Sequence, residues 1–378
     1  MKSALIIGGS NGIGLAIAFE LSEICESVTI VDRVAPKVKL PANLRVIEEN
    51  LLITDFKWLE EVGNIDTLFY SAGFGRVAPF ESLYDKEIDN SFTVNTISAF
   101  KVLKYFIPRM KSQEPFYCGV MVSIAARIAS PLFSIYSATK ASLFRGIEAI
   151  NTELMMSGSE NRILEVSPGS IKGTSFTGKE TDLSVTKELA NSIIHQMFNH
   201  EEVFIPEYES IFRSVINRYN EDPSKFAAES YKYKIKGNRL QLKPQLTIGY
   251  LSGTFDLFHI GHLNLLKRAR KYCDYLVVGV HKDASHKGKE TFIPFEERMD
   301  IVRNIKYVDR VIESEREDSD VYTKGIVKYD KLFVGSDYKG TERFNRYEQY
   351  FADKGVEIIY FPYTKGTSST QLRSALNK

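Results

Sequence analysis

The chain has 378 residues, of which 43% are hydrophobic and 26% are charged, and this length exceeds what one hydrophobic core usually supports, so we expect two domains. A net charge of +1 and the lack of any apolar run of transmembrane length argue against partners such as nucleic acid or a membrane. The N-terminus enters a glycine turn too early for a signal peptide, and three cysteines without metal-ligand spacing fit a cytoplasmic protein with free thiols and no structural metal.

The first predicted elements are a strand at 4–7, a glycine-rich turn and a helix that continues to Leu21. The turn reads Gly8-Gly9-Ser10-Asn11-Gly12-Ile13-Gly14, and its glycines allow the backbone to approach a pyrophosphate closely. A second strand ends in Asp32, whose carboxylate can accept a hydrogen bond from an adenosine ribose hydroxyl. Asp32 favours NAD(H), whereas Arg33 leaves NADP(H) as the alternative, because its guanidinium could bind a 2′-phosphate.

Further strands are predicted at 67–70 and 119–122, with helical stretches between them. Strands that alternate with helices in this way predict a parallel sheet. Ala72 and Gly73 follow the first of these strands, and ligands of open α/β sheets bind at such strand ends. The pattern therefore predicts an α/β, doubly wound fold with a dinucleotide site.

A possible catalytic group follows in Ser123, Tyr136 and Lys140. Tyr136 and Lys140 are four residues apart on one predicted helix and therefore share a face. A nearby ammonium would lower the pKa of the tyrosine, so that the phenol could give a proton to a carbonyl as a hydride arrives. Ser123, at a strand end, could hold that carbonyl oxygen. The alternative is a chance Tyr and Lys pair on a solvated helix face.

Together with Ser167-Pro168-Gly169, these motifs resemble the short-chain dehydrogenase/reductase family over about residues 1–205. The resemblance implies that Asn95 is a fourth catalytic residue, which supports the lysine through a water, and that the domain forms homo-oligomers. It also implies that NAD(P)H is bound by Gly8, Ser10, Asn11, Gly12, Ile13, Gly14, Asp32, Arg33, Ala72, Gly73, Pro168 and Gly169. The chain departs from the family at Tyr70-Ser71, where Asn-Asn is usual, and at Asn50-Leu51, where an Asp-Val pair often meets the adenine.

The first domain is expected to end at residue 236, after a helical stretch at about 209–219. Tyrosine and lysine alternate from Tyr231 to Lys234, and we interpret this segment as a solvated connector rather than as a basic patch for nucleic acid. A linker at 237–245 then leads to a second, smaller domain at 246–378.

The second domain opens with an apolar strand at 246–251, which runs into Gly253-Thr254-Phe255-Asp256-Leu257-Phe258-His259-Ile260-Gly261-His262 and a helix. Free N–H groups and the helix dipole at such a turn suit a phosphate. His259 and His262, three residues apart, would point towards it and stabilise the charge of a pentacovalent α-phosphorus. The alternatives are a helix cap or a zinc site. Lys287 and Lys289, in a polar loop, could neutralise further phosphates.

This stretch, Glu297-Arg298-Met299 and Thr364 to Thr370 resemble the cytidylyltransferase family that includes glycerol-3-phosphate cytidylyltransferase. The resemblance covers residues 246–378 and implies a Rossmann-like fold, CTP as substrate with Mg²⁺, and contact of Arg298 with a substrate phosphate. The implied catalytic residues are His259, His262, Lys289 and Arg298. The implied nucleotide-binding residues are Gly253, Thr254, Phe255, Asp256, Asp283, Lys287, Asp309, Thr364, Ser368 and Ser369. Tyr363 stands where the family usually has an arginine.

Two active sites on one chain predict consecutive reactions. We expect reduction of a ketose phosphate, with ribulose 5-phosphate or xylulose 5-phosphate favoured, followed by coupling of the alditol phosphate with CTP. The product would be a CDP-alditol, such as CDP-ribitol, CDP-arabinitol or CDP-glycerol, for a surface polysaccharide. One alternative is a nicotinamide-sensing or dimerisation domain joined to an active transferase. Another is an adenylyltransferase, because ATP-using enzymes share the His-x-Gly-His pattern.

Overall fold

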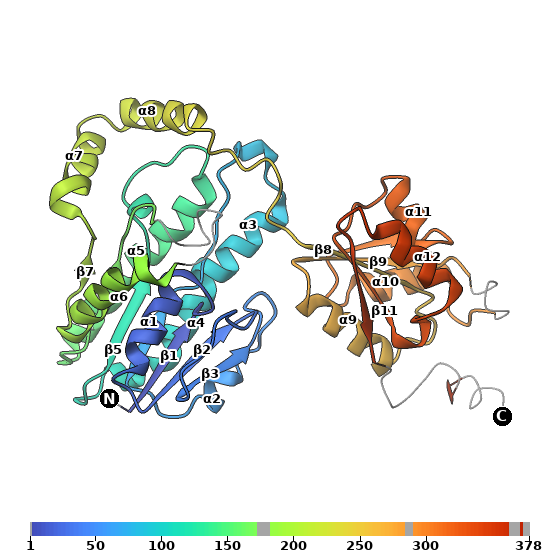
Figure 1. Cartoon of the computed structure of the whole chain (residues 1–378), viewed down its shortest axis with the longest axis horizontal. Coiled ribbons are helices and arrows are strands. Elements are labelled where there is room, and N and C mark those ends of the chain that lie inside the picture. The colour runs from blue at the N-terminus through green and yellow to red at the C-terminus, as the bar shows by residue number, and fades with distance from the viewer. Residues whose placement is uncertain (1, 172–181, 284–289, 363–370, 373–378) are drawn as a thin grey trace. The chain divides into compact units, whose positions relative to one another are not determined.

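The computed structural model describes residues 2–171, 182–283, 290–362 and 371–372. The chain forms two compact units, Met1–Gln245 and Leu246–Lys378, which Figure 1 shows in its blue-to-yellow and orange-to-red parts. Each unit is an α/β fold around a parallel sheet, and the second sheet is the smaller, as predicted. No helix in the described ranges is long and apolar enough to cross a bilayer.

Seven parallel strands form the sheet of the first unit, in the order β3-β2-β1-β4-β5-β6-β7. They are β1 (Ser3–Ile7), β2 (Ser27–Asp32), β3 (Leu44–Glu48), β4 (Thr67–Tyr70), β5 (Tyr117–Met121), β6 (Ile163–Val166) and β7 (Val203–Phe204). Their residues are apolar on both faces because helices cover both faces. The chain order reverses between β1 and β4, and the crevice beyond the carboxyl ends of these strands is where a ligand of such a sheet binds.

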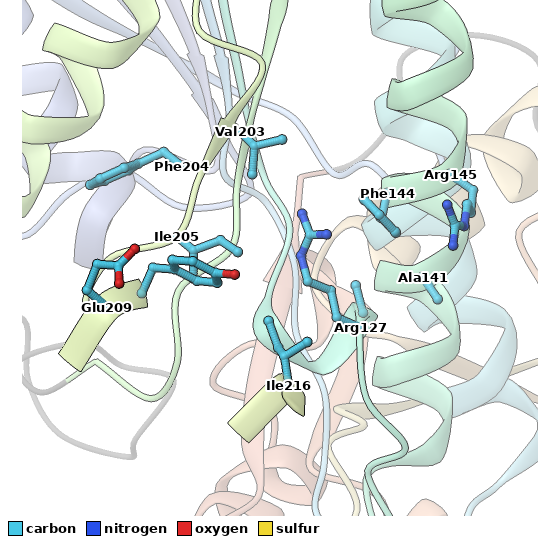
Figure 2. Close-up of a pocket in the computed structure, with 11 residues that line it drawn as sticks. Arg127, Ala141, Phe144, Arg145, Val203, Phe204, Ile205, Glu209 and Ile216 are labelled. Atoms are coloured by element: carbon cyan, nitrogen blue, oxygen red, sulfur yellow. The ribbon is translucent and has the colours of Figure 1, made fainter. Parts of the chain in front are cut away.

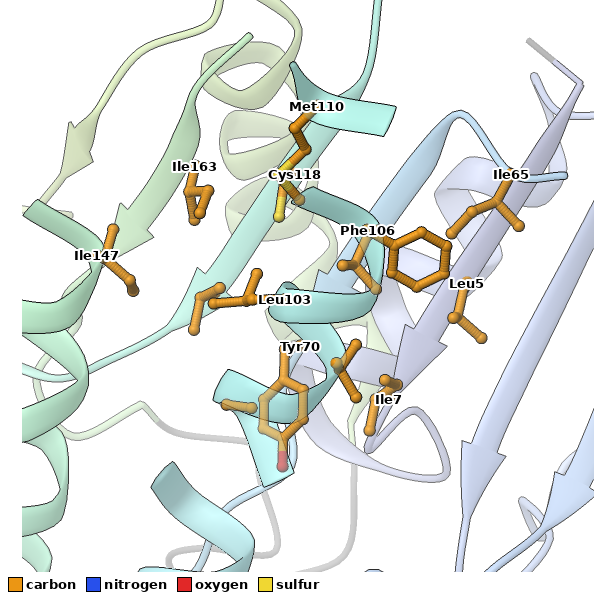
Figure 3. Close-up of a cluster of buried hydrophobic side chains, with 14 of the residues drawn as sticks. Leu5, Ile7, Ile65, Tyr70, Leu103, Phe106, Met110, Cys118, Ile147 and Ile163 are labelled. Carbon is orange, nitrogen blue, oxygen red and sulfur yellow. The ribbon is translucent and has the colours of Figure 1, made fainter. Parts of the chain in front are cut away.

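Helices pack on both faces of this sheet. α2 (Trp58–Glu61), α4 (Ser98–Met110) and α5 (Ser134–Met156) cover one face, and α1 (Gly12–Ser22) and α6 (Leu183–Phe198) cover the other. Figure 3 shows the core of the first face, where Leu103 and Phe106 of α4 lie over strand residues such as Leu5 and Tyr70. The Tyr70 hydroxyl donates to the Val94 carbonyl at 2.5 Å, so this polar group has a hydrogen-bond partner inside the core.

The end of the first unit differs from the sequence prediction. The segment that we interpreted as a solvated connector is a helix, α8 (Pro223–Lys236), which follows the π-helical turn η5 (Tyr208–Phe212) and α7 (Arg213–Glu221). Asp222 explains its start, because the carboxylate caps the helix by accepting from the Lys225 amide at 2.9 Å and Pro223 suits the first helical position. The alternation of Tyr and Lys did not reveal this helix, whose start is determined by the capping residue before it.

Five parallel strands form the second sheet, in the order β10-β9-β8-β11-β12. They are β8 (Ile248–Gly253), β9 (Tyr275–Val280), β10 (Arg310–Glu313), β11 (Lys331–Gly335) and β12 (Glu357–Phe361). Helices α9 (Ile260–Lys271) and α10 (Phe295–Arg303) contribute to the core on one face, and α11 (Asp318–Thr323) and α12 (Glu342–Phe351) to the core on the other. The order reverses between β8 and β11, so the predicted histidine turn lies directly after a strand at the switch point.

Candidate active sites

The glycine-rich turn of the first unit forms a cradle that only glycine permits. Gly8 has a φ of +81°, and a Cβ there would lie 2.4 Å from the Ala72 backbone nitrogen. A Cβ on Gly14 would lie 2.2 Å from the Gly8 carbonyl oxygen. This close packing brings the N-terminus of α1 to the end of β1, where its free N–H groups suit a pyrophosphate. Ala72 is held beside the cradle because its amide donates to the Ile7 carbonyl at 3.0 Å.

Asp32 at the end of β2 is hydrogen-bonded to this turn. Its carboxylate accepts from the Ser10 amide at 3.0 Å and from the Arg33 amide at 2.7 Å, while the Ser10 hydroxyl donates to the Val34 carbonyl. Each carboxylate oxygen keeps a lone pair that a ribose hydroxyl could use. The other predicted residues lie in the first turn of α1 or just before it, namely Asn11, Gly12 and Ile13.

Asn95 connects the loop after β4 to helix α5. It lies in the π-helical segment η2 (Thr93–Ile97), between α3 (Asp85–Phe92) and α4, and is fully buried. Its amide nitrogen donates to the Phe74 carbonyl at 2.8 Å and to the Thr139 hydroxyl at 3.0 Å, and its amide oxygen accepts from the Phe74 amide at 3.0 Å. A Cβ on Gly73 would lie 3.2 Å from the Lys140 Nζ and 3.3 Å from the Asn95 oxygen, so these three residues are neighbours.

Tyr136 and Lys140 lie on the first turns of α5, next to Ser123. The Lys140 Nζ lies 5.7 Å from the centre of the Tyr136 ring and donates to the Met121 carbonyl at 2.8 Å. Tyr136 is hydrogen-bonded to the Ser123 side chain, and its ring stacks on Phe133 at 4.3 Å. The four residues predicted as catalytic are therefore brought together by the fold.

The predicted lowering of the tyrosine pKa is wrong for this structure. Burial raises the pKa of Tyr136 to about 12, and the hydrogen bond with Ser123 acts in the opposite direction without reversing the shift. Burial also lowers the pKa of Lys140 to about 7, since only 1% of this residue is exposed. Desolvation disfavours the charged forms of both side chains. The spacing of the two residues carries no information about burial.

The pKa of Lys140 makes the stability of the first unit depend on pH. It is about 7 in the folded chain against 10.5 for an ordinary lysine, so between these values the unfolded chain binds more protons and stability rises with pH. We expect a rise of at most about 1.4 kcal/mol per pH unit. Lys140→Met should remove this rise. Urea denaturation at several pH values, followed by the fluorescence of Trp58, the single tryptophan, measures the free energy of unfolding. If this free energy rose equally with pH in the wild-type chain and in Lys140→Met, the lowered pKa of Lys140 would be contradicted.

Pro168 and Gly169 follow β6 and lie against the Ser123 loop. The Ile124 amide donates to the Pro168 carbonyl at 3.0 Å. A Cβ on Gly169 would lie 2.4 Å from the Phe212 ring, so this glycine allows the segment after β7 to pack closely. Both residues are thus placed at the carboxyl edge of the sheet beside the catalytic group.

Two cavities lie near α5. The larger, of about 740 Å³, is between α5 and the segment after β7, and Figure 2 shows Arg127 pointing into it beside Phe144. Neither Tyr136 nor Lys140 lines it. A small cavity of about 20 Å³ is lined by Tyr136 and by residues of the loop after β4. Of these two cavities, only the small one is therefore lined by a predicted catalytic residue, Tyr136.

In the second unit, His259 and His262 lie together at the start of α9. Their rings stack with centres 4.0 Å apart. The His259 Nδ1 accepts from the Gly261 amide at 3.0 Å, so His259 also caps the helix. Burial lowers the pKa of His259, which favours the neutral imidazole with its proton on Nε2. This N–H is a donor for a phosphate oxygen, so capping and phosphate binding are compatible.

Arg298 has a role that the sequence did not predict. It is fully buried, and its guanidinium donates to four carbonyls: those of Ile293 at 2.9 Å, Thr254 at 2.5 Å, His281 at 2.8 Å and Lys282 at 2.7 Å. These carbonyls come from the loops after β8 and β9 and from the segment before α10. Arg298 therefore holds these three segments together. Four of its five N–H groups are in use, and its contact with a substrate phosphate stays a prediction.

The residues that follow β8 divide between the core and the site. The Phe255 side chain is 2% exposed and packs in the core, so its predicted contact with a nucleotide would have to come from its backbone. Asp256 is likewise buried and accepts from the Phe292 and Ile293 amides at 3.0–3.1 Å. The Thr254 hydroxyl is buried and has no hydrogen-bond partner among the described residues. It is thus available to a ligand.

Asp309 lies at the wrong edge of the sheet for the predicted nucleotide contact. It immediately precedes β10, and its carboxylate accepts from the Leu276 amide, at the start of β9, at 2.8 Å. It also lies 3.7 Å from the buried Arg270 guanidinium. The histidines follow the carboxyl end of β8, whereas Asp309 is at the amino ends of the strands. The position of Asp309 in the sheet therefore argues against a nucleotide contact, and a sequence motif does not specify that position.

Asp309→Asn should therefore affect folding rather than substrate binding. We expect a loss of about 3–5 kcal/mol of stability, because Arg270 would keep a buried charge without the Asp309 carboxylate. The KM for CTP should not change. Thermal unfolding and steady-state kinetics measure the two effects, and a higher KM at unchanged stability would restore the nucleotide-binding interpretation.

The remaining predicted residues add little geometry. Gly253 ends β8, and Asp283 follows β9 near Arg298. Lys287, Lys289, Thr364, Ser368 and Ser369 lie outside the described residues. Within the described ranges, no group of three or more His, Cys, Asp or Glu side chains could hold a metal ion. Sequence reasoning missed Gly75 and Phe133, which contact the Tyr136 ring, because no motif spacing marks such contacts.

Comparisons with known proteins find a different family in each of the two units. Residues 2–183 match the short chain dehydrogenase family and residues 250–375 match the cytidylyltransferase-like family. The glycerol-3-phosphate cytidylyltransferase of Bacillus spizizenii is 38% identical over 126 residues, which are 32% of this chain and 90% of the relative. That of Bacillus subtilis is 35% identical over 129 residues, 33% of this chain and 92% of the relative.

Solved structures resemble the first unit in fold. A short-chain dehydrogenase from Burkholderia cenocepacia, in complex with NADP, has a TM-score of 0.50 at 19% identity and covers 61% of this chain and 96% of its own. One from Streptomyces avermitilis has a TM-score of 0.51 at 18% identity and covers 63% of this chain and 100% of its own. At this identity the likeness concerns the fold alone.

Proposed function

We propose that this chain, which belongs to the cytidylyltransferase-like family through its second unit and carries a short-chain dehydrogenase domain in its first, catalyses two consecutive reactions. The first unit reduces a ketose phosphate to an alditol phosphate. The second joins that phosphate to CMP from CTP, with release of pyrophosphate, and gives a CDP-alditol. The observation that carries the proposal is the presence of a grouped Ser123, Tyr136 and Lys140 in one unit and of stacked His259 and His262 in the other.

In the reductase site, Tyr136 would be the acid. Its pKa of about 12 keeps the phenol protonated at neutral pH, so the hydroxyl can give its proton to the carbonyl oxygen that Ser123 holds. Lys140, with a pKa of about 7, can return a proton to Tyr136. Bound NAD(P)H supplies the hydride. The cradle formed by Gly8 and Gly14 fits its pyrophosphate.

For the choice of cofactor, two neighbouring side chains are decisive. The Asp32 carboxylate suits a free ribose hydroxyl and so favours NADH. The exposed Arg33 beside it is the group that would accept the 2′-phosphate of NADPH. An Asp32→Ser variant should therefore move the preference towards NADPH.

In the transferase site, a phosphate oxygen of the alditol phosphate attacks the α-phosphorus of CTP, and the bond to pyrophosphate breaks. The His259 Nε2–H and the N-terminal amides of α9 would stabilise the charge that develops on the α-phosphate oxygens. The buried Thr254 hydroxyl is a further donor. Mg²⁺ would enter with the triphosphate and neutralise part of its charge.

Substrate specificity and context are parts of the same proposal. Ribulose 5-phosphate and xylulose 5-phosphate are the favoured ketoses, and CDP-ribitol, CDP-arabinitol or CDP-glycerol the candidate products. Such activated alditols suit the synthesis of a surface polysaccharide. As in many reductases of this family, the first unit would mediate homo-oligomer formation.

The test is oxidation of NADH and NADPH with ribulose 5-phosphate, xylulose 5-phosphate, fructose 6-phosphate and dihydroxyacetone phosphate, each followed by CTP and Mg²⁺. One active ketose whose product then consumes CTP is the expected result. Consumption of CTP with supplied alditol phosphates but no reduction of any ketose would refute the coupled function and leave a transferase with a nicotinamide-sensing domain. ATP as the better nucleotide would replace cytidylyl by adenylyl transfer.

A further inference from the structure

Residues 241–245, here called the exit strap, lead out of the first unit and are hydrogen-bonded to the loop that follows β4. The Gln241 amide donates to the Val77 carbonyl at 2.8 Å, and the Gln241 side-chain oxygen accepts from the Val77 amide at 3.2 Å. Arg76 donates to the Gln241 carbonyl at 3.0 Å. Main chain and side chain of one residue thus hold two consecutive loop residues.

A buried ion pair fixes the exit strap in place. Arg76 binds Glu87 through two hydrogen bonds of 2.8 Å, and their side chains are only 3% and 5% exposed. Glu87 also accepts from the Gln245 amide at 3.2 Å, and Arg76 donates to the Ser82 carbonyl at 2.9 Å. The pair therefore joins the loop, α3 and both ends of the exit strap, and burial makes each of these bonds costly to break.

The same loop reaches the proposed acid. A Cβ on Gly75 would lie 2.6 Å from the Tyr136 ring and 2.9 Å from the Phe133 ring, so the loop backbone packs directly on both rings. The cavity of about 20 Å³ is lined by Tyr136 and by Gln245, among others. The exit strap and the catalytic tyrosine therefore border one space.

Helix α8, which leads to the exit strap, holds a second loop near Tyr136, the one that precedes α5. The Lys234 Nζ donates to the Ser130 hydroxyl and to the Pro131 carbonyl, each at 2.7 Å. The two loops are joined in turn, because the Ala78 amide donates to the Leu132 carbonyl at 2.7 Å. Residues 234–245 thus support both loops that contact Tyr136 and its neighbour Phe133.

We propose that two residues of the exit strap, Gln241 and Gln245, are part of the reductase site. Gln241 is a positioning residue that acts on Tyr136 through Val77 and Gly75, and Gln245 lines the small cavity next to Tyr136. This inference rests on the proposed reduction and adds to it that the segment leading to the transferase unit sets the geometry of the proton donor.

Gln241→Ala tests the inference, with Leu242→Ala as the matched control because Leu242 is the next residue and is 81% exposed. Loss of the side-chain bond to Val77 should lower the kcat of reduction by about tenfold, less than the hundredfold that a 1 Å misplacement can cost. The KM for the ketose phosphate should change less, and cytidylyl transfer should not change. Gln241→Glu keeps the acceptor oxygen and should restore kcat.

A reductase kcat of Gln241→Ala equal to that of Leu242→Ala would overturn the inference. So would a Gln241→Glu variant as slow as Gln241→Ala, since the acceptor oxygen would then be irrelevant. If the wild-type chain reduces no ketose phosphate, the proposed function fails by itself. Amide hydrogen exchange then tests separately whether Gln241 holds the loop after β4. The amides of residues 75–78 should exchange faster in Gln241→Ala than in Leu242→Ala, and equal rates would refute this role of Gln241.

Discussion

Replacing Tyr136 by phenylalanine is expected to lower the rate of ketose phosphate reduction by about 10²–10⁴-fold, the usual contribution of a general acid. The substitution removes only the hydroxyl, while the ring keeps its stacking on Phe133 and its contact with Gly75. The fold and cytidylyl transfer should therefore be unaffected. Oxidation of NADH or NADPH with the active ketose phosphate measures the first rate, and release of pyrophosphate from CTP the second.

Tyr105→Phe is the matched control, because this tyrosine of the same unit is 46% exposed and lies on α4. It should reduce as fast as the wild-type chain. A Tyr136→Phe variant with full reductase activity would show that another group, or water, supplies the proton. The proposed roles of Ser123 and Lys140 would then also be refuted, because both depend on proton donation by the Tyr136 hydroxyl.

Replacing His259 is expected to lower the rate of cytidylyl transfer by about 10²–10³-fold, as for other donors to a developing oxyanion. His259 also caps α9, so a loss of activity on alanine substitution alone would not separate the two roles. His259→Asn does separate them, because an asparagine side chain can accept from the same amide but carries no imidazole. We expect the Asn variant to be as slow as the Ala variant but about 1 kcal/mol more stable.

The reductase rate should be the same in both His259 variants, and His195→Asn, at an exposed position of α6, is the control for histidine loss. Transfer restored by His259→Asn would mean that His259 serves only as a helix cap. Thermal unfolding of the three variants, measured beside the transfer rates, distinguishes these outcomes.

The sequence predicted features that local chemistry determines. Gly8 and Gly14 are required because the backbone of this turn lies too close to neighbouring backbone atoms for a Cβ. The helical spacing of Tyr136 and Lys140 places both on one face of α5. The grouping of His259 and His262 follows in the same way from their distance along the chain. Both parallel sheets follow from the alternation of strands and helices.

Features that depend on tertiary packing could not be predicted. The pKa of Lys140 is set by its burial, and burial depends on residues far away in the chain. Arg298 and Asp309 match family positions, yet Arg298 donates four of its five N–H groups to backbone carbonyls, and Asp309 lies at the opposite edge of the sheet from the histidines. The exit strap was predicted as a linker because its composition is that of a connector. Its hydrogen bonds to Val77 and Glu87 are not encoded locally.

The Arg76–Glu87 pair also determines where the chain can be divided. A fragment that ends at Lys236 keeps all seven strands of the first sheet but leaves Arg76 without the Gln241 carbonyl and Glu87 without the Gln245 amide. A fragment that ends after Gln245 keeps both. The second sheet begins at Ile248, so hardly any chain separates the last residue that the reductase needs from the first strand of the transferase. A gene that separates the two activities would have to cut within these few residues, or give up part of the first active site.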